Sequence, residues 1–199
     1  MTATTTDIIL ASASPRRQEL LARIGLAFAV VPSQVEETER AGEAPEQHAE
    51  RLSRDKALEV ASRSGQGGRW FIGSDTIVLQ DNIILGKPKD AAEAAAMLRR
   101  LSGRVHRVLS GYAVHDRQSG QTLSGVVATR VFFKTLTPRE IEGYIATGEP
   151  FDKAGAYAIQ GIGAFMVPRI EGSYSNVVGL PLCEVIAALE QLGAIELFA

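Results

Sequence analysis

The stretch that most constrains the fold is residues 8–21, where a short apolar run meets a turn of small residues and then the start of a helix. Ile8-Ile9-Leu10 favours a short strand, and the small residues that follow it end the strand. Ser14 is a typical N-cap because its hydroxyl can accept a hydrogen bond from an amide of the first turn. Pro15 suits the first helical position, where no N–H is needed. The stretch therefore predicts a strand, a turn and a helix whose N-terminal amides point at one spot.

That spot favours an anion, and the side chains around the turn suit a phosphate. Ser12 and Ser14 supply hydroxyl groups, and Arg16 and Arg17 supply guanidinium groups that can each hold two phosphate oxygens. The turn contains no Gly-x-x-x-x-Gly-Lys motif, so it is not a Walker loop. An ordinary capped helix with two solvated arginines is the alternative, and this stretch alone does not decide between the two.

The composition limits the classes of function that remain. A chain of 199 residues is long enough for one large domain or two small lobes with a proper core. Its formal net charge of −2 argues against broad binding of nucleic acid or membrane surfaces, which usually needs a basic excess. No apolar run reaches membrane-spanning length, and residues 1–7 lack the parts of a signal peptide. We therefore expect a cytoplasmic protein.

Apolar spacing and turn residues predict the remaining elements. Helices are expected over residues 45–63, 90–101, 137–146 and 182–192, and strands over residues 28–31, 69–79, 83–85, 105–115, 123–134 and 164–170. The segment from Phe151 to Leu182 is rich in glycine and is expected to be mostly loop. Loops this long in a compact domain are often functional.

Asp75 interrupts the most hydrophobic of the predicted strands. An ionised carboxylate among residues such as Phe71 and Ile77 is costly unless it is paired or binds a metal. Gly73 permits a bulge or a close backbone approach just before it. A structural aspartate with local hydrogen bonds is the alternative. We favour a functional role, because buried charges in special surroundings concentrate at sites.

Two lysines lie where they could reach such a site. Lys56 is on or beside the apolar stripe of the predicted helix, where it either covers the core with its stem or leans into a cleft. Lys87 lies between Gly86 and Pro88, in a turn too stiff to move far.

Four acidic residues follow the predicted strand that ends at Pro32. Glu36 and Glu37 come soonest after it and could reach a site at the mouth of a sheet, whereas Glu39 and Glu43 are expected to be solvated.

No chemistry is assigned to the histidines or to the single cysteine. His48 and His115 are expected at the surface, His106 is expected to be structural, and Cys183 is expected to be a small buried hydrophobe on a helix.

Taken together, the motifs resemble the Maf family, the septum-formation-inhibitor-like proteins, over nearly the whole chain. In chain order they are Ala11-Ser-Ala-Ser-Pro-Arg-Arg17, Arg51-Leu52 with Lys56-Ala57, Gly73-Ser-Asp-Thr76, Gly86-Lys-Pro88, Leu101-Ser-Gly103 with His106, Asp152-Lys-Ala-Gly-Ala-Tyr157 with Ile159-Gln-Gly161, and Gly172-Ser-Tyr174 running to Gly179-Leu-Pro-Leu182. Each motif is short, but together and in order they are specific. Departures are slight: Ala13 stands where glycine is frequent, and Ser110 where threonine is frequent.

The resemblance implies a mixed α/β fold related to the inosine triphosphatase type. It implies one Maf-like domain over residues 1–199, with a twisted sheet, flanking helices and two lobes around a central cleft. The implied activity is nucleoside triphosphate pyrophosphatase, in which water attacks the α-phosphorus and releases a monophosphate and pyrophosphate, as house-cleaning of nucleotide pools. A divalent metal cation is implied, with Mg²⁺ expected and Mn²⁺ as the alternative.

On this resemblance the candidate residues take roles in the site. Ser12, Ser14, Arg16 and Arg17 bind the β- and γ-phosphates, and Lys56 and Lys87 approach the α-phosphate. Asp75 holds the metal, takes the proton of the attacking water, or does both. The family points to Glu37 rather than Glu36 as the second metal ligand, since magnesium prefers carboxylates and water.

Thr76, Lys153 and Gln160 complete the predicted substrate contacts. Lys153 and Gln160 resemble the branch of the family that acts on dTTP and UTP, with 5-modified uridine triphosphates as further candidates. Gln160 offers one donor and one acceptor, which complement the N3–H and a carbonyl of uracil or thymine.

Two other functions stay open. One is a nucleotide-binding regulator of septum formation or cell division without turnover, against which the buried Asp75 beside Lys87 and Glu37 argues. The other is a pyrophosphatase for 7-methyl-GTP or a damaged purine triphosphate, against which Lys153 and Gln160 argue through the resemblance. The partner expected is a small-molecule nucleotide, with no nucleic acid and no membrane. The sequence does not give the oligomeric state, and an isologous homodimer is compatible with an enzyme of this size.

Overall fold

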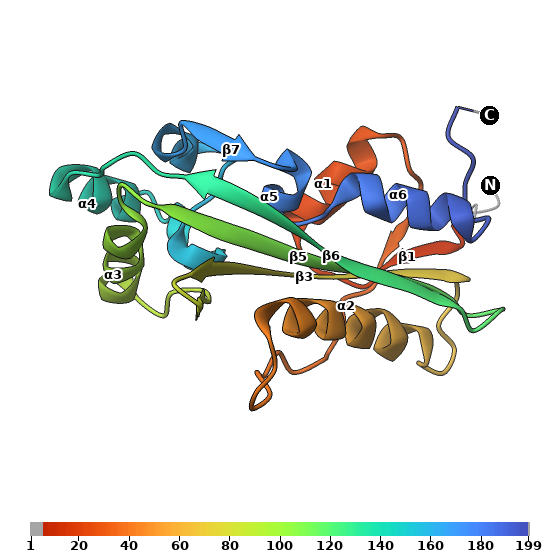
Figure 1. The fold of residues 1–199 in the computed structure, drawn as a ribbon. Coiled ribbons are helices and arrows are strands. Elements are labelled where there is room, and N and C mark those ends of the chain that lie inside the picture. The colour runs from red at the N-terminus through yellow and green to blue at the C-terminus, as the bar shows by residue number, and fades with distance from the viewer. Residues whose placement is uncertain (1–5, 199) are drawn as a thin grey trace. The chain divides into compact units, whose positions relative to one another are not determined.

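The computed structural model describes residues 6–198, whose elements are traced in Figure 1. The chain divides into two compact units. The first unit comprises Met1–Asp75, Ser110–Val127 and Gly179–Ala199, and the second comprises Thr76–Leu109 and Ala128–Val178. In the described residues no helix combines the length and the apolar character that crossing a membrane requires.

The helices and strands follow in this order: β1 (Ile8–Leu10), α1 (Pro15–Arg23), β2 (Ala29–Val30), α2 (Pro45–Ala61), β3 (Trp70–Gln80), β4 (Ile83–Leu85), α3 (Ala91–Leu101), β5 (Val105–Asp116), β6 (Thr122–Phe132), α4 (Pro138–Ala146), 3₁₀ segments at Glu149–Asp152, Ala154–Ala156 and Ile162–Met166, β7 (Arg169–Glu171), α5 (Tyr174–Val178) and α6 (Leu182–Gln191).

The strands pair in the order β2-β1-β3-β5-β6-β7, and β4 pairs with β3. β1 is parallel to both of its neighbours, with Ile9 opposite Ala29 on one side and Phe71 on the other. The β3–β4 and β6–β7 pairs are antiparallel. Parallel and antiparallel pairs together with flanking helices confirm the predicted mixed α/β class.

In the first unit, α2 packs directly against the strands. Phe71, Val60 and Ala57 are fully buried and belong to one apolar cluster. The contact is close because two strand residues have no side chain: a Cβ on Gly73 would lie 2.0 Å from the Ser53 carbonyl oxygen, and one on Gly111 2.1 Å from that of Ala49. Glycine at these positions therefore brings the helix backbone against the sheet.

In the second unit, α3 and α4 contribute to a separate apolar core. Its buried members are Val78, Leu85, Ala94, Met97, Leu98, Leu101, Val108, Val131, Phe133, Leu136, Ile141, Tyr144, Ala156, Tyr157 and Met166. Both helices are capped by side chains at their N-termini: Asp90 accepts from the Glu93 amide, and Thr137 forms a capping box with Glu140.

One local prediction was confirmed in position but not in its hydrogen bond, and another was wrong. Ser14 is the N-cap residue of α1, but its hydroxyl makes no capping hydrogen bond. The strand predicted over residues 164–170 is only Arg169–Glu171, and the apolar residues before it form a 3₁₀ segment. Gly161 is left-handed at φ 83°, and the amides of Ala164 and Val167 bond three residues back, so this segment turns instead of extending.

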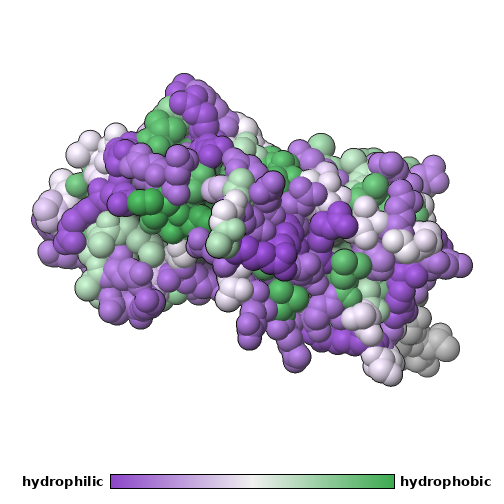
Figure 2. Space-filling model, turned by 60° about the horizontal axis from the view of Figure 1, so that its bottom comes forward, coloured by the Kyte–Doolittle hydropathy of each residue, from purple (hydrophilic) through white to green (hydrophobic). Residues whose placement is uncertain are grey.

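One face of the molecule is displayed in Figure 2. Hydrophilic side chains predominate on it, and hydrophobic ones form small separate groups. This is the usual surface of a globular protein.

Candidate active site

Lys56 and two carboxylates form the centre of the candidate site in the first unit. The Nζ atom of Lys56 donates to Oδ1 of Asp75 at 2.7 Å and to Oε1 of Glu37 at 2.6 Å. The side chains of Lys56 and Asp75 are each only 8% exposed, whereas that of Glu37 is 57% exposed. The Lys56 ammonium is therefore buried against two acidic groups.

The packing of β3 on α2 explains why Asp75 meets Lys56. Gly73 and Asp75 are two residues apart on the strand, so they face the same side, and Gly73 lets that side touch the helix. The Asp75 amide donates to Oγ of Ser53 at 3.0 Å, and this hydroxyl in turn donates to the Ala49 carbonyl at 2.7 Å. Asp75 is thus held through backbone and side chain by one helix.

The turn before α1 is organised around Arg17. Its Nη1 donates to Oγ of Ser12 at 2.9 Å, and its Nε donates to the carbonyl oxygen of Gly179 at 2.7 Å. The Ser14 amide donates to the same Ser12 hydroxyl at 3.3 Å. Ser12, rather than Ser14, is therefore the hydroxyl that binds within the turn, and Gly179 is an anchor that the sequence did not assign.

Electrostatics connect the turn to the carboxylates. Burial lowers the pKa of the Arg17 guanidinium, while the charges of Asp75 and Glu37 oppose that shift. The neighbouring Arg16 repels Arg17 and lowers its pKa further. The structure thus brings Arg17 into the field of the same two carboxylates.

Asp75 and Glu37 are the described residues that best suit a divalent cation. Because their oxygens bind the same ammonium, they cannot lie further apart than the sum of those two hydrogen-bond lengths. The described residues contain no group of three or more His, Cys, Asp or Glu that could hold a metal ion. A cation here would therefore have two protein carboxylates and would need further oxygens from water or a ligand.

The other predicted substrate residues belong to the second unit. Thr76 follows Asp75 in β3 and is half-buried, and Lys87 is exposed just after β4. Lys153 donates from Nζ to the Glu149 carbonyl at 3.0 Å and pairs with Asp152. Gln160 is half-buried between two 3₁₀ segments.

Glu149 holds the turn that follows Gln160, a role the sequence did not reveal. Its carboxylate accepts from the Tyr144 hydroxyl at 2.9 Å and from the amides of Ile162 and Gly163 at 3.0 and 2.9 Å. A Cβ on Gly161 would lie 2.6 Å from the same carboxylate. The closely spaced Gly161 and Gly163 are the sequence signal for such a tight turn.

Several residues expected at the surface or in the core lie elsewhere. His48 is buried and Glu43 is half-buried, with side chains 6% and 11% exposed, and both lie beside Arg51, whose side chain is 16% exposed. His115 is also buried, and its Nδ1 lies 2.9 Å from Oγ1 of Thr122. Cys183 is exposed rather than buried.

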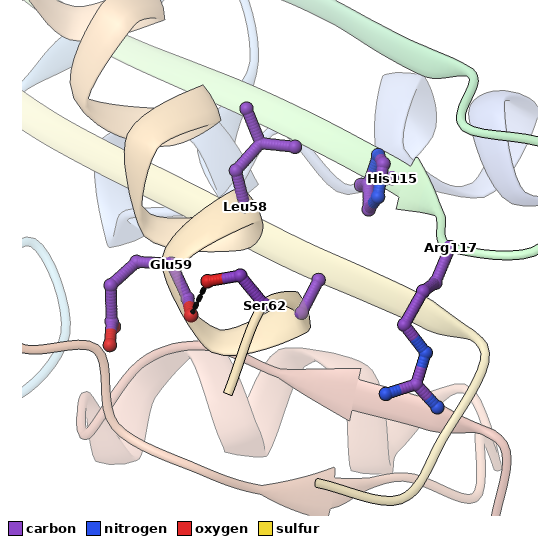
Figure 3. A pocket seen from close by; sticks show the side chains of 6 residues that line it. Leu58, Glu59, Ser62, His115 and Arg117 are labelled. Atoms are coloured by element: carbon purple, nitrogen blue, oxygen red, sulfur yellow. Dashed lines mark hydrogen bonds between the residues drawn. The ribbon is translucent and has the colours of Figure 1, made fainter. Parts of the chain in front are cut away.

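A pocket beside the C-terminal end of α2 contains none of the candidate residues. Figure 3 shows it, lined by Leu58, Glu59, Ala61, Ser62, His115 and Arg117. The Arg117 guanidinium already donates to the carbonyls of Gln66 and Gly68.

Comparison with known proteins gives similarity over almost the entire chain. The family model described as "Maf-like protein" matches residues 7–192. A dTTP/UTP pyrophosphatase of Syntrophotalea carbinolica is 65% identical over 192 residues, which are 96% of this chain and 87% of that protein. Proteins of the same name from Geotalea uraniireducens and Myxococcus xanthus are 58% and 53% identical, and each alignment covers at least 96% of both chains.

Proposed function

The chain belongs to the Maf-like protein family, as its motifs predicted, and we propose that it is a nucleoside triphosphate pyrophosphatase that hydrolyses dTTP and UTP to the monophosphate and pyrophosphate. The observation that carries the proposal is the Lys56 ammonium held between the carboxylates of Asp75 and Glu37, within the field of Arg17. The names of relatives at 53–65% identity support the substrates.

The turn before α1 is the proposed site for the β- and γ-phosphates. A triphosphate carries nearly four negative charges, and phosphoryl transfer gains mostly from positioning and charge stabilisation. The amides at the start of α1 and the Ser12 hydroxyl donate to phosphate oxygens, and Arg16 and Arg17 neutralise them. Arg17 is already oriented by Gly179, so little ordering remains when the phosphate arrives.

Asp75 is the proposed proton acceptor for the attacking water, a cation ligand, or both. Its carboxylate is buried and compensated by Lys56, so a second cationic or proton-donating group can share it. As the α-phosphate approaches, the Lys56 ammonium can donate to it and stabilise the charge that develops there.

The two carboxylates fit a magnesium ion, which is commonly held by one or two carboxylates together with water and substrate phosphates. Asp75 and Glu37 would hold the ion, with Mn²⁺ as the alternative to Mg²⁺. A bound divalent cation supplies neutralisation of phosphate charge and a lowered pKa for its water.

The proposed roles of the second-unit residues rest on the family motifs. Lys87 acts on the α-phosphate, and Thr76 and Lys153 contact the substrate. Gln160 reads the N3–H and a carbonyl of uracil or thymine, for which its side chain has the right donor and acceptor. The enzyme would act in the cytoplasm as one Maf-like domain on residues 1–199, and a homodimer is compatible with this activity.

The test is a panel of triphosphates incubated with purified protein and Mg²⁺: dTTP, UTP, CTP, GTP, ATP and 7-methyl-GTP. Products are resolved as monophosphate with pyrophosphate or as diphosphate with phosphate. Release of pyrophosphate from dTTP and UTP ahead of the other nucleotides is the expected result. Preference for 7-methyl-GTP would reassign the substrate, and tight binding without turnover would favour the regulatory alternative.

A further inference from the structure

The segment that carries Glu37 has no strand or helix of its own. Residues 31–44, which we call the Glu37 loop, lie between β2 and α2 and form only a turn near Gly42. No ladder of backbone hydrogen bonds therefore fixes the position of Glu37. Its side chain is 57% exposed, and an ion pair with one exposed partner orders a loop only weakly.

The Glu37 loop is instead fastened along α2 by side chains of the helix and the residues after it. At its start, the Gln34 amide donates to Oε2 of Glu59 at 3.1 Å, and the Pro32 carbonyl accepts from Arg63 at 2.9 Å. In its middle, Glu37 binds Lys56. The loop therefore runs antiparallel to the helix, since its later residues contact earlier helical positions.

Arg51 makes the last and most extensive of these attachments. Its Nε and Nη2 donate to the two carboxylate oxygens of Glu43 at 2.5 and 2.7 Å, and Nη2 also donates to the Thr38 carbonyl at 3.1 Å. Thr38 is the residue directly after Glu37. On the other side, Nδ1 of His48 lies 3.1 Å from Oε2 of Glu43, and Nη1 of Arg51 donates to Asp55 at 3.4 Å.

We propose that Arg51 is a positioning residue for Glu37: with Glu43 it forms a clamp that holds the Glu37 loop on α2 and keeps the Glu37 carboxylate at Lys56. The catalytic meaning of this clamp rests on the proposed function, whereas the clamp itself does not. A planar guanidinium is required, because a single ammonium cannot hold both oxygens of Glu43 and the Thr38 carbonyl in one fixed geometry.

The hydrogen bonds of the clamp are shielded from water, and its carboxylate stays charged. The Arg51 and Glu43 side chains are 16% and 11% exposed, so water competes little for their hydrogen bonds. Hydrogen bonding to Arg51, then to His48, lowers the pKa of Glu43 to about 2 against the cost of burial, so the carboxylate stays ionised under ordinary conditions.

The first test is a double-mutant cycle in the whole enzyme. Arg51→Lys is expected to lower kcat about tenfold and to raise the Mg²⁺ concentration for half-maximal activity severalfold, while the same change made in a Glu37→Gln background has little further effect. Glu43→Gln should reproduce the Arg51→Lys result. This second variant provides the test if Arg51→Lys does not fold. Equal losses in the two backgrounds would show that Arg51 acts independently of Glu37 and would overturn the proposal.

The matched control is Arg69→Lys. Arg69 holds Asp116 through two hydrogen bonds of 3.0 Å in the same unit, and among the described residues it makes no hydrogen bond or ion pair with the Glu37 loop. The Arg69→Lys substitution should therefore lower the midpoint of thermal unfolding without changing the dependence of activity on Mg²⁺ concentration. A comparable change in Mg²⁺ dependence would mean that loss of stability alone produces the effect.

The second test needs no activity. Hydrogen exchange at the amides of Gln34 and Val35, which donate to the side chains of Glu59 and Ser33, should become at least about tenfold faster in Arg51→Lys and should stay unchanged in Arg69→Lys. Unchanged exchange in Arg51→Lys would refute the clamp. If the wild-type enzyme releases no pyrophosphate, the proposed function fails, and this measurement still decides whether Arg51 orders the loop.

Discussion

The Nζ atom of Lys56 lies 2.7 Å from Oδ1 of Asp75, and both side chains are almost completely buried. A buried ion pair of this kind adds little stability by itself, because the loss of hydration offsets most of the attraction. Glu37 brings a second carboxylate to the same ammonium from a more exposed position. This arrangement leaves more negative than positive charge at the centre, which suits a site that receives a cation.

Asp75→Asn should abolish most of the turnover. The amide keeps the size of the side chain, but it neither accepts a proton nor attracts a cation as a carboxylate does. We expect kcat for dTTP to fall by at least about 100-fold, measured as pyrophosphate released at saturating substrate. The matched control is Asp116→Asn, another buried carboxylate of the first unit, paired with Arg69. Wild-type kcat in Asp75→Asn would remove Asp75 from the mechanism.

Lys56→Met should destabilise the protein by leaving Asp75 buried without its ammonium partner. We expect a loss of about 3 kcal/mol in the free energy of unfolding, and a thermal midpoint lower by about 6–12 °C for a chain of this size. Lys56→Met combined with Asp75→Asn should regain part of that loss, because the unpaired charge is gone. If the double variant is less stable than Lys56→Met alone, the ion pair is not the cause.

Gln160→Ala should change selectivity between bases more than it changes catalysis. Losing one donor and one acceptor to uracil should lower kcat/KM for UTP by about tenfold, with little effect on GTP. The control is Gln118→Ala, an exposed glutamine in the turn between β5 and β6. Steady-state kinetics measure the ratio of kcat/KM for UTP to kcat/KM for GTP. Equal losses of kcat/KM for the two nucleotides would exclude base recognition by Gln160.

The elements could be predicted from the sequence wherever the signal is local. Proline at the first helical position marked the start of α1, apolar residues at helical spacing marked α2, and turn residues between two apolar runs marked β5 and β6. The strand predicted over residues 164–170 was wrong because hydrophobicity does not reveal the left-handed Gly161 that turns the chain.

The partners of the site residues could not be predicted in the same way. Asp75 was recognisable as a costly buried charge, but its contact with Lys56 depends on Gly73 letting β3 touch α2. Glu43 resembled any solvated acidic residue, since its burial depends on Arg51. Such contacts join residues of different segments, 8 and 19 positions apart in these two cases, and a single sequence carries no spacing rule for them.

His106 should make stability depend on pH between about 6.5 and 4. Burial lowers its pKa from 6.5 to about 4, so the folded protein keeps it neutral while the unfolded chain takes up a proton as the pH falls below 6.5. Its stabilising contribution is therefore complete above pH 6.5 and is lost as the pH falls through the folded value, a change of about 3 kcal/mol.

The comparison that isolates this effect is His106→Phe. Phenylalanine can keep the edge contacts with the rings of Phe133 and Tyr157, but it cannot take up a proton. It also removes the 2.8 Å hydrogen bond between Nε2 and the Tyr157 hydroxyl, so the variant should be less stable at pH 7. Denaturant unfolding at each pH should show that the free energy of unfolding of the wild type, relative to that of the variant, falls by about 3 kcal/mol from pH 6.5 to 4. A difference that stays constant over this range would mean that His106 takes up its proton equally in the folded and unfolded states.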